Sequence, residues 1–150
     1  MTAYLDALRM LARRELSEAQ LRERLVRRGH ADDAVEAALA RLRAEGAVND
    51  ARAAEAIAHT ETTLRRRGRL RVKRQIERAG IAPAIARQAV DAVFDTLDDG
   101  ALLEEALTKR LRGAGTIADE RELARLFRYL VSQGFEPERV LIALRKRKSG

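Results

Sequence analysis

Cysteine and tryptophan are absent from this sequence of 150 residues, and histidine and proline each occur only twice. Without cysteine, the chain can form neither a disulfide nor a thiolate metal site, which fits a reducing cytoplasm. Aromatic residues make up only 3% of the chain, so surfaces for ring stacking are scarce. Disulfide scaffolds and cysteine-based zinc sites are thereby excluded.

Long apolar runs are missing as well. No stretch approaches the roughly 20 apolar residues that a helix needs to cross a bilayer. The first ten residues mix apolar with charged side chains and contain no continuous apolar core. We therefore expect neither a secretory signal nor a membrane partner, and we predict a cytoplasmic protein.

Patterns typical of catalytic or metal sites are not found either. His30 follows a glycine, where we expect a packing position between helices, and His59 stands near Glu55 and Glu61 in a helical segment. Two histidines this far apart predict no metal site. No nucleophile can be paired with a base. We expect no catalytic residues, no metal and no cofactor, so an enzyme is the least favoured class.

Good helix formers dominate what is present, chiefly alanine, leucine, arginine and glutamate. Apolar residues account for 46% of the chain and charged residues for 35%, enough for a core and a hydrated surface. No segment alternates apolar and polar residues in the manner of a strand. The sequence predicts an all-α fold.

One helical pattern recurs about every 50 residues along the chain. Gly29, Gly80 and Gly134 each follow apolar residues four and eight positions earlier, and a second amphipathic run begins after each glycine. With one further helix before each pair, this pattern predicts three three-helix repeats, at residues 1–50, 51–100 and 101–150. Each repeat is too small to bury much surface alone, so we expect about nine helices stacked into an elongated, curved array.

Several helix boundaries are marked by local signals. Ser17 with Gln20 and Asp119 with Glu122 have the spacing of a capping box, which predicts helices beginning just after Ser17 and Asp119. The two prolines stand where first helical residues belong, at Pro83 and Pro137.

Positive charge is concentrated in one short segment. Residues 65–78 contain eight basic residues and a single acid, a sum of +7 that equals the formal net charge of the whole chain. Crowded like charges oppose folding and indicate an anionic partner, most commonly a phosphate backbone. The residues predicted to bind DNA or a DNA-bearing filament are Arg65, Arg66, Arg67, Arg69, Arg71, Lys73, Arg74 and Arg78. A second contact is expected at the basic C-terminal residues Arg145, Lys146, Arg147 and Lys148.

A helix that begins near residue 70 would give this segment two faces. The face expected to anchor the helix holds Val72, Ile76 and Ala79. The face expected to point outward holds Arg71, Arg74 and Arg78. Because guanidinium groups bind two phosphate oxygens at once and no aromatic residue lies in the segment, we predict contact with the backbone and little reading of sequence.

A helix-turn-helix transcription factor is a competing interpretation, since a short glycine turn joins the predicted second and third helices. The candidate recognition helix, however, begins with Asp32 and Asp33 and continues through Glu36. These acids would point into a negatively charged groove, so sequence-specific reading of the major groove is disfavoured.

Short motifs follow one another along nearly the whole chain: ALRMLARRELS at residues 7–17, continuing to residue 29; GAVND at 46–50; RGR at 67–69; and QI at 75–76, leading to GI at 80–81. In this order they resemble the RecX family of bacterial proteins that regulate the RecA recombinase. The resemblance implies a non-catalytic regulator that binds the RecA–DNA filament and inhibits filament growth, ATP hydrolysis and strand exchange. It also implies weak, largely sequence-independent binding of single-stranded or double-stranded DNA.

Two other classes of function stay open at this point. The chain is alternatively a general helical nucleic-acid-binding protein with no recombinase partner, or a helical scaffold whose basic segment binds an acidic protein. The charge pattern does not separate these classes, because carboxylates and phosphates attract the same cations. On the family resemblance we favour the recombinase regulator, and we expect it to act as a monomer.

Overall fold

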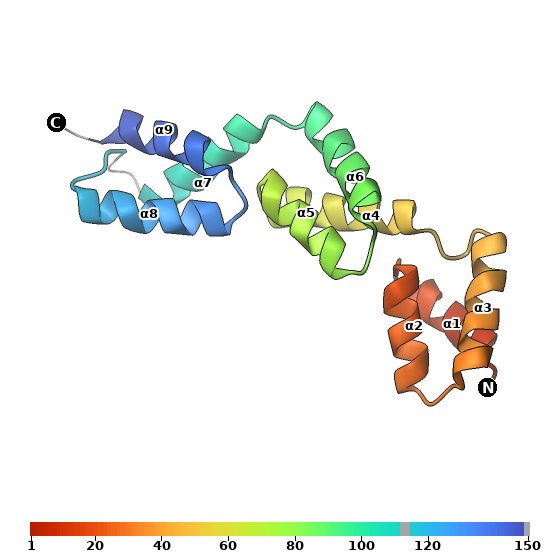
Figure 1. The fold of residues 1–150 in the computed structure, drawn as a ribbon. Helices are drawn as coiled ribbons and strands as arrows, with labels where there is room; N and C mark the ends of the chain where they lie inside the picture. Colours follow the sequence, from red (N-terminus) through yellow and green to blue (C-terminus); the bar gives the residue numbers. More distant parts are fainter. Residues whose placement is uncertain (112–114, 149–150) are drawn as a thin grey trace. The chain divides into compact units, whose positions relative to one another are not determined.

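The computed structural model describes residues 1–111 and 115–148, and this part of the chain is helical almost throughout (Figure 1). It contains nine α-helices and one short π-helical segment, and its only β-type pairing is an isolated bridge between Ile117 and Lys148. The prediction of an all-α fold is confirmed. The elements are α1 (Ala3–Arg13), α2 (Glu18–Arg27), α3 (Asp32–Ala44), α4 (Asp50–His59), the π-helix η1 (Thr60–Leu64), α5 (Arg69–Arg78), α6 (Pro83–Thr96), α7 (Asp99–Leu111), α8 (Glu120–Ser132) and α9 (Pro137–Arg147).

The chain divides into two compact units. Unit 1 comprises Met1–Ile57 with Gln75–Ala89, and unit 2 comprises Ala58–Arg74 with Val90–Gly150. The boundaries between them fall inside helices α4, α5 and α6. Within the residues described, no helix is both long enough and apolar enough to cross a membrane.

Unit 1 is built around the mutual packing of α1, α2 and α3 (Figure 1). Leucines spaced by four residues on α2 and by three on α3 lie on one face of each helix, as the helical period requires. Fully burying each such side chain stabilises the fold by about 1.5–3 kcal/mol. The buried core of this unit consists of Ala7, Leu16, Leu21, Leu25, Val35, Leu39, Leu42 and Val48.

Unit 2 contains the corresponding packing of α7, α8 and α9 (Figure 1). Leu126 and Leu130 on α8 face Phe135, which follows the turn glycine Gly134 and is 1% exposed. Gly134 has a φ of 102°, a conformation that favours glycine, and this ends α8 sharply. The same arrangement of apolar pair and glycine occurs at Gly29, where φ is 92°.

Most of the predicted helix boundaries are confirmed, and one is corrected in detail. Helices α6 and α9 begin at Pro83 and Pro137, as predicted. The Asp119 carboxylate accepts the backbone N–H of Glu122 at 2.9 Å, but the Glu122 carboxylate accepts from Ala118 at 3.0 Å rather than from Asp119. The capping box predicted here is therefore only half formed, because the chain before Asp119 presents the preceding N–H to Glu122.

Ser17 joins two parts of unit 1. Its hydroxyl accepts the N–H of Gln20 at 3.0 Å, and the Gln20 side chain returns a bond to the N–H of Ser17, which completes the predicted capping box. The same hydroxyl donates to the backbone carbonyl of Ala79, just beyond the end of α5. Ser17 is fully buried, so no water can replace either partner.

Replacing Ser17 with alanine is expected to lower the free energy of unfolding by about 2–3 kcal/mol, because it removes a cap and leaves the Ala79 carbonyl unsatisfied. Thr2→Ala is the matched control, since Thr2 caps α1 by accepting the N–H of Leu5 but is exposed. We expect Thr2→Ala to lower the free energy of unfolding by about 1 kcal/mol or less. Urea denaturation checks both values, and equal losses would contradict the role assigned to the Ala79 carbonyl.

Candidate nucleic-acid interface

The start of α5 is held against the end of α8 by direct contact between backbones. The N–H of Gly68 donates to the Gln133 carbonyl at 2.9 Å, and the N–H of Leu70 donates to the Gly134 carbonyl at 3.0 Å. A Cβ atom at Gly68 would lie 2.6 Å from the carbonyl carbon of Gly134, so only glycine permits this approach. The first part of the basic segment, residues 65–74, thereby begins beside the end of α8 within unit 2.

Helix α5 separates apolar from basic side chains as predicted. Val72 and Ile76 are completely buried and Ala79 is 5% exposed. On the other side, Arg74 and Arg78 are exposed, and neither side chain has a hydrogen bond or ion pair with the residues described. The periodicity of the sequence therefore correctly predicted which face of this helix is buried.

Three of the predicted binding arginines are instead paired with carboxylates of unit 2. The Arg65 guanidinium lies 3.6 Å from Glu61, Arg66 binds Glu105 through two bonds of 2.9 and 3.3 Å, and Arg69 lies 2.7 Å from Asp91. These carboxylates compete with any outside anion for the same guanidinium groups. The side chains keep about 35–57% of their surface exposed, so the pairs are accessible to solvent.

The Arg66–Glu105 pair shifts the pKa of both partners toward their charged forms. The hydrogen bond from Arg66 holds the pKa of the Glu105 carboxyl below its usual range, with a smaller contribution from Lys109. The same bond raises the pKa of Arg66. Arg66 also has a φ of 55°, a conformation that non-glycine residues rarely adopt. This arginine is positioned mainly by contacts inside the protein.

Two further arginines of the segment bond to neutral groups at the end of α8, so no carboxylate offsets their charge. Arg67 donates to the side chain of Gln133, and Arg71 donates to the Ser132 carbonyl at 3.0 Å. Lys73 is half-buried and has a partner of its own. Of the eight predicted residues, Arg74 and Arg78 have exposed side chains with no hydrogen bond or ion pair among the residues described.

The structure adds three arginines that the analysis of the sequence did not select. Arg121, Arg125 and Arg128 are exposed on α8, and their spacing of four and three residues puts them on one face of that helix. None of their side chains has a hydrogen bond or ion pair among the residues described. This spacing is visible in the sequence, but the neighbouring acids Glu120 and Glu122 mask it when only net charge is counted.

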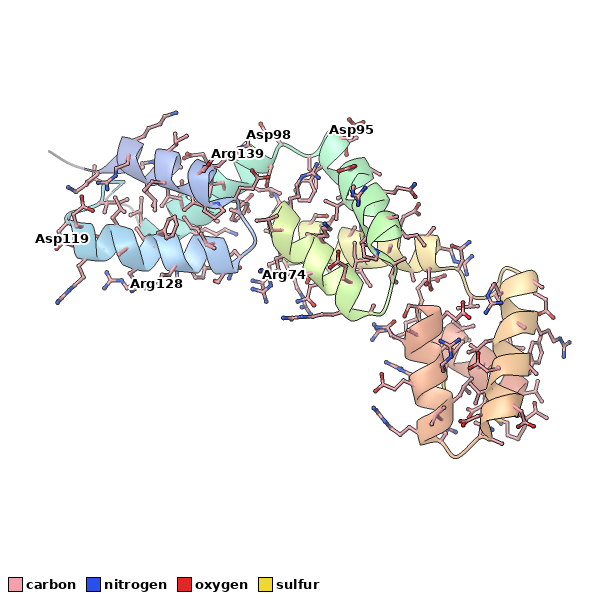
Figure 2. The ribbon with its side chains drawn as sticks, viewed as in Figure 1. Arg74, Asp95, Asp98, Asp119, Arg128 and Arg139 are labelled. Carbon is pink, nitrogen blue, oxygen red and sulfur yellow. The ribbon has the colours of Figure 1, made fainter. Side chains whose placement is uncertain are left out.

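The arginines of α5 and α8 come from two helices that contact each other in unit 2. Arg71 bonds to the last residue of α8, Arg74 lies one turn further along α5, and Arg128 lies one turn before the end of α8. In Figure 2, Arg74 and Arg128 lie along one edge of this unit, while Asp95 and Asp98 lie along the opposite edge. We call this surface the basic strip, and it consists of Arg71, Arg74, Arg121, Arg125 and Arg128.

The basic residues near the C-terminus are largely neutralised. Three of the four residues predicted as a second contact pair with acids of unit 2: Arg145 and Lys148 with Glu120 at 2.7 and 3.1 Å, and Arg147 with Glu104 at 2.8 Å. The hydrogen bond from Arg145 is the main cause that lowers the pKa of the Glu120 carboxyl. Lys146 is exposed and has no such partner among the residues described. Arg145, Lys146 and Arg147 form the last turn of α9 rather than a free tail.

The histidines do not assemble a reactive centre in the described part of the chain. His30 Nε2 lies 2.8 Å from the Asp6 carboxylate, and both side chains are largely buried, so His30 packs between elements as predicted. His59 is exposed at the end of α4. Among the residues described, no three histidine, aspartate or glutamate side chains cluster in a way that could hold a metal.

Comparison with known proteins gives consistent matches. Residues 3–42 match the model of the RecX first three-helix domain. The chain is 37% identical to the regulatory protein RecX of Chromohalobacter salexigens, over 93% of this chain and 88% of that protein. It is 33% identical to the regulatory protein RecX of Halorhodospira halophila, over 91% of this chain and 83% of that protein.

Solved structures share the fold. The crystal structure of RecX from Lactobacillus salivarius superposes with a TM-score of 0.74 over 96% of this chain and 95% of its own, at 21% identity. A second crystal structure, of a regulatory protein RecX, superposes with a TM-score of 0.80 over 96% of this chain and 70% of its own, at 18% identity. At these identities the likeness shows the fold alone.

Glu105→Gln is expected to destabilise the protein in a way that depends on pH. A lowered carboxyl pKa stabilises the folded state above the unfolded pKa of about 4.3, and this contribution is lost as pH falls through the folded pKa. Because the pair is partly exposed, the loss at pH 7 should not exceed about 1 kcal/mol. Urea denaturation at neutral and acidic pH checks this, and a difference that grows toward acidic pH would contradict it.

Proposed function

The chain belongs to the RecX family of regulatory proteins, and on that premise we propose that it regulates the RecA recombinase by binding the RecA–DNA filament. In this proposal the protein is a non-catalytic, monomeric inhibitor of filament growth, ATP hydrolysis and strand exchange. It acts in the cytoplasm, where bacterial DNA lies. The observation that carries the DNA-binding part is the basic strip of unit 2.

The chemistry of the basic strip supports contact with phosphates. Its five cations are all arginines, whose planar guanidinium groups match phosphate oxygens in pairs. Of the two acids in the first turn of α8, Glu120 is already paired with Arg145 and Lys148, and the Glu122 carboxylate accepts the backbone N–H of Ala118 rather than bonding to an arginine of the strip. No aromatic residue belongs to the strip, which favours recognition of the backbone over stacking with bases. Binding of this kind is independent of sequence and suits a filament that forms on any DNA.

Sequence-specific recognition through the α2–α3 pair has no comparable support. The first turn of α3 exposes Asp32 and Asp33, and Glu36 on the same helix pairs with Arg22 at 2.7 Å. A helix that begins with exposed carboxylates would repel the phosphates that line the major groove. We therefore assign DNA contact to unit 2 and not to a helix-turn-helix in unit 1.

The five arginines of the basic strip predict a steep dependence of DNA affinity on salt. If each neutralises one phosphate, the logarithm of affinity should fall with the logarithm of salt concentration at a slope of roughly −3.5 for single strands or −4.5 for duplex. Fluorescence anisotropy with labelled oligonucleotides at several salt concentrations measures this slope. A slope near zero would remove DNA as a direct ligand.

Reversing two charges of the strip tests its position. Arg74→Glu combined with Arg128→Glu should weaken DNA binding by more than roughly tenfold at physiological salt, for every sequence alike. Arg87→Glu is the matched control, because Arg87 is an exposed arginine of α6 in unit 1 with no partner among the residues described. Binding by the double variant at the level of this control would reject the basic strip as the DNA contact.

The recombinase partner is tested by ATP hydrolysis. Substoichiometric amounts of the protein should reduce RecA-catalysed hydrolysis on single-stranded DNA, because one bound inhibitor that blocks filament growth affects many subunits. The Arg74→Glu/Arg128→Glu variant should inhibit far less, and Arg87→Glu should inhibit as the native chain does. If hydrolysis is unaffected while DNA binding persists, the protein is instead a general nucleic-acid-binding protein without a recombinase partner.

A further inference from the structure

Unit 1 carries a second concentration of positive charge, formed by residues outside the segment that dominates the sequence. A groove of about 460 Å³ runs between α1 and α2. Its lining contains six arginines against one carboxylate, with Met10 as its single apolar residue. We call it the arginine groove, and its arginines are Arg9, Arg13, Arg14, Arg24, Arg27 and Arg28.

The cations of the groove are mostly available to an outside anion. All six arginines are exposed. The side chains of Arg9, Arg13, Arg14 and Arg24 have no hydrogen bond or ion pair among the residues described, and the basic strip contains the same number of such arginines. Arg27 forms only an exposed pair with Glu23 one turn away. The groove therefore holds a positive field that Glu23 and Asp6 offset only in part.

The single carboxylate of the groove is already satisfied. Asp6 is 3% exposed, and its carboxylate receives Arg28 at 3.1 Å and His30 at 2.8 Å. Its partners cover it, so it does not compete for the other five arginines. The stabilising effect of cations at helix ends explains part of the pattern, since Arg13 and Arg24 lie in last turns. It does not explain why Arg9, in the middle of α1, faces the same groove.

The arrangement selects the kind of anion. Arg9 and Arg13 are four residues apart on α1, about 6 Å along its axis, and Arg24 of α2 has the same spacing to Arg28, the residue that caps the end of α2. Two rows of guanidinium groups exceed what a single phosphate can satisfy, and they suit a chain of phosphates. Apart from Met10 the lining offers no apolar anchor, so its composition favours a polyanion over a protein surface. With no aromatic residue in the lining, the bases of a nucleic acid would not be stacked.

We propose that the arginine groove is a second binding site for a nucleic-acid backbone, so that one molecule holds two separate segments of DNA. This inference rests on the proposed binding of DNA by the basic strip, which supplies the other site. Each unit then carries its own contact, and neither contact reads sequence. A regulator with two such sites would tether a second DNA segment to the one on which it acts.

Stoichiometry and bridging test this directly with the full chain. The native protein should bind two short single-stranded oligonucleotides per chain, and it should retain a labelled oligonucleotide on beads that carry a second one unable to pair with it. Arg13→Gln combined with Arg24→Gln should reduce the stoichiometry to one and abolish capture. The Arg74→Glu/Arg128→Glu variant should do the same through the other site.

Matched variants distinguish loss of the groove from loss of positive charge elsewhere on unit 1. Arg87→Gln removes one exposed arginine of unit 1 outside the groove and should leave capture unchanged. Arg13→Lys with Arg24→Lys keeps the charge and should retain capture, whereas the glutamine pair should weaken binding at the groove roughly tenfold at physiological salt. Circular dichroism confirms that each variant is folded, as expected for exposed positions.

Three results would overturn the inference. The native chain could bind only one oligonucleotide, the Arg13→Gln/Arg24→Gln variant could still capture the labelled oligonucleotide, or the groove could bind inorganic tripolyphosphate but not oligonucleotides. Inhibition of RecA-catalysed hydrolysis is measured in parallel on the same preparations. Native protein that inhibits hydrolysis but does not bridge overturns only the second site, whereas native protein that bridges but does not inhibit overturns only the recombinase partner.

Discussion

The backbone contact between Gly68 and the end of α8 is the constraint on which the candidate interface depends. Because neither Gly68 nor Gly134 has a side chain, the two backbones approach closely enough to share hydrogen bonds. This contact places Arg71 on the Ser132 carbonyl and brings the start of α5 to the end of α8. Two helices that are far apart in sequence thereby contribute to one basic strip.

Within unit 2, carboxylates divide the cations into two groups. Glu61, Glu105 and Asp91 each hold one arginine, which relieves the repulsion expected from eight crowded basic residues. The Arg66–Glu105 and Arg69–Asp91 pairs are partly exposed on both sides and contribute little net stability, so an incoming phosphate can replace these two carboxylates at small cost. The arginines without carboxylates then provide the initial attraction. Paired and unpaired arginines thus have different expected roles in the proposed binding of DNA.

Both candidate DNA sites rely on positive charge, and neither offers aromatic side chains on which bases could stack. The basic strip and the arginine groove consist of arginines without aromatic partners, and each lies within one compact unit. Recognition of this kind depends strongly on salt and tolerates any sequence. These properties fit the proposed role on a recombinase filament, where the protein partner would supply the selectivity that phosphates cannot.

Local signals in the sequence determined the helices and their buried faces. Ser17, Pro137 and the glycine after each apolar pair fixed helix ends, and the spacing of Val72 and Ile76 fixed the buried side of α5, because caps and periodicity act over only a few residues. Which arginines remain free was decided only by the tertiary structure. Glu105 neutralises Arg66 from 39 positions away, and the stripe on α8 joins α5 only through the contact at Gly68. Ion pairs between distant segments depend on how helices pack, and no local pattern of residues encodes that packing.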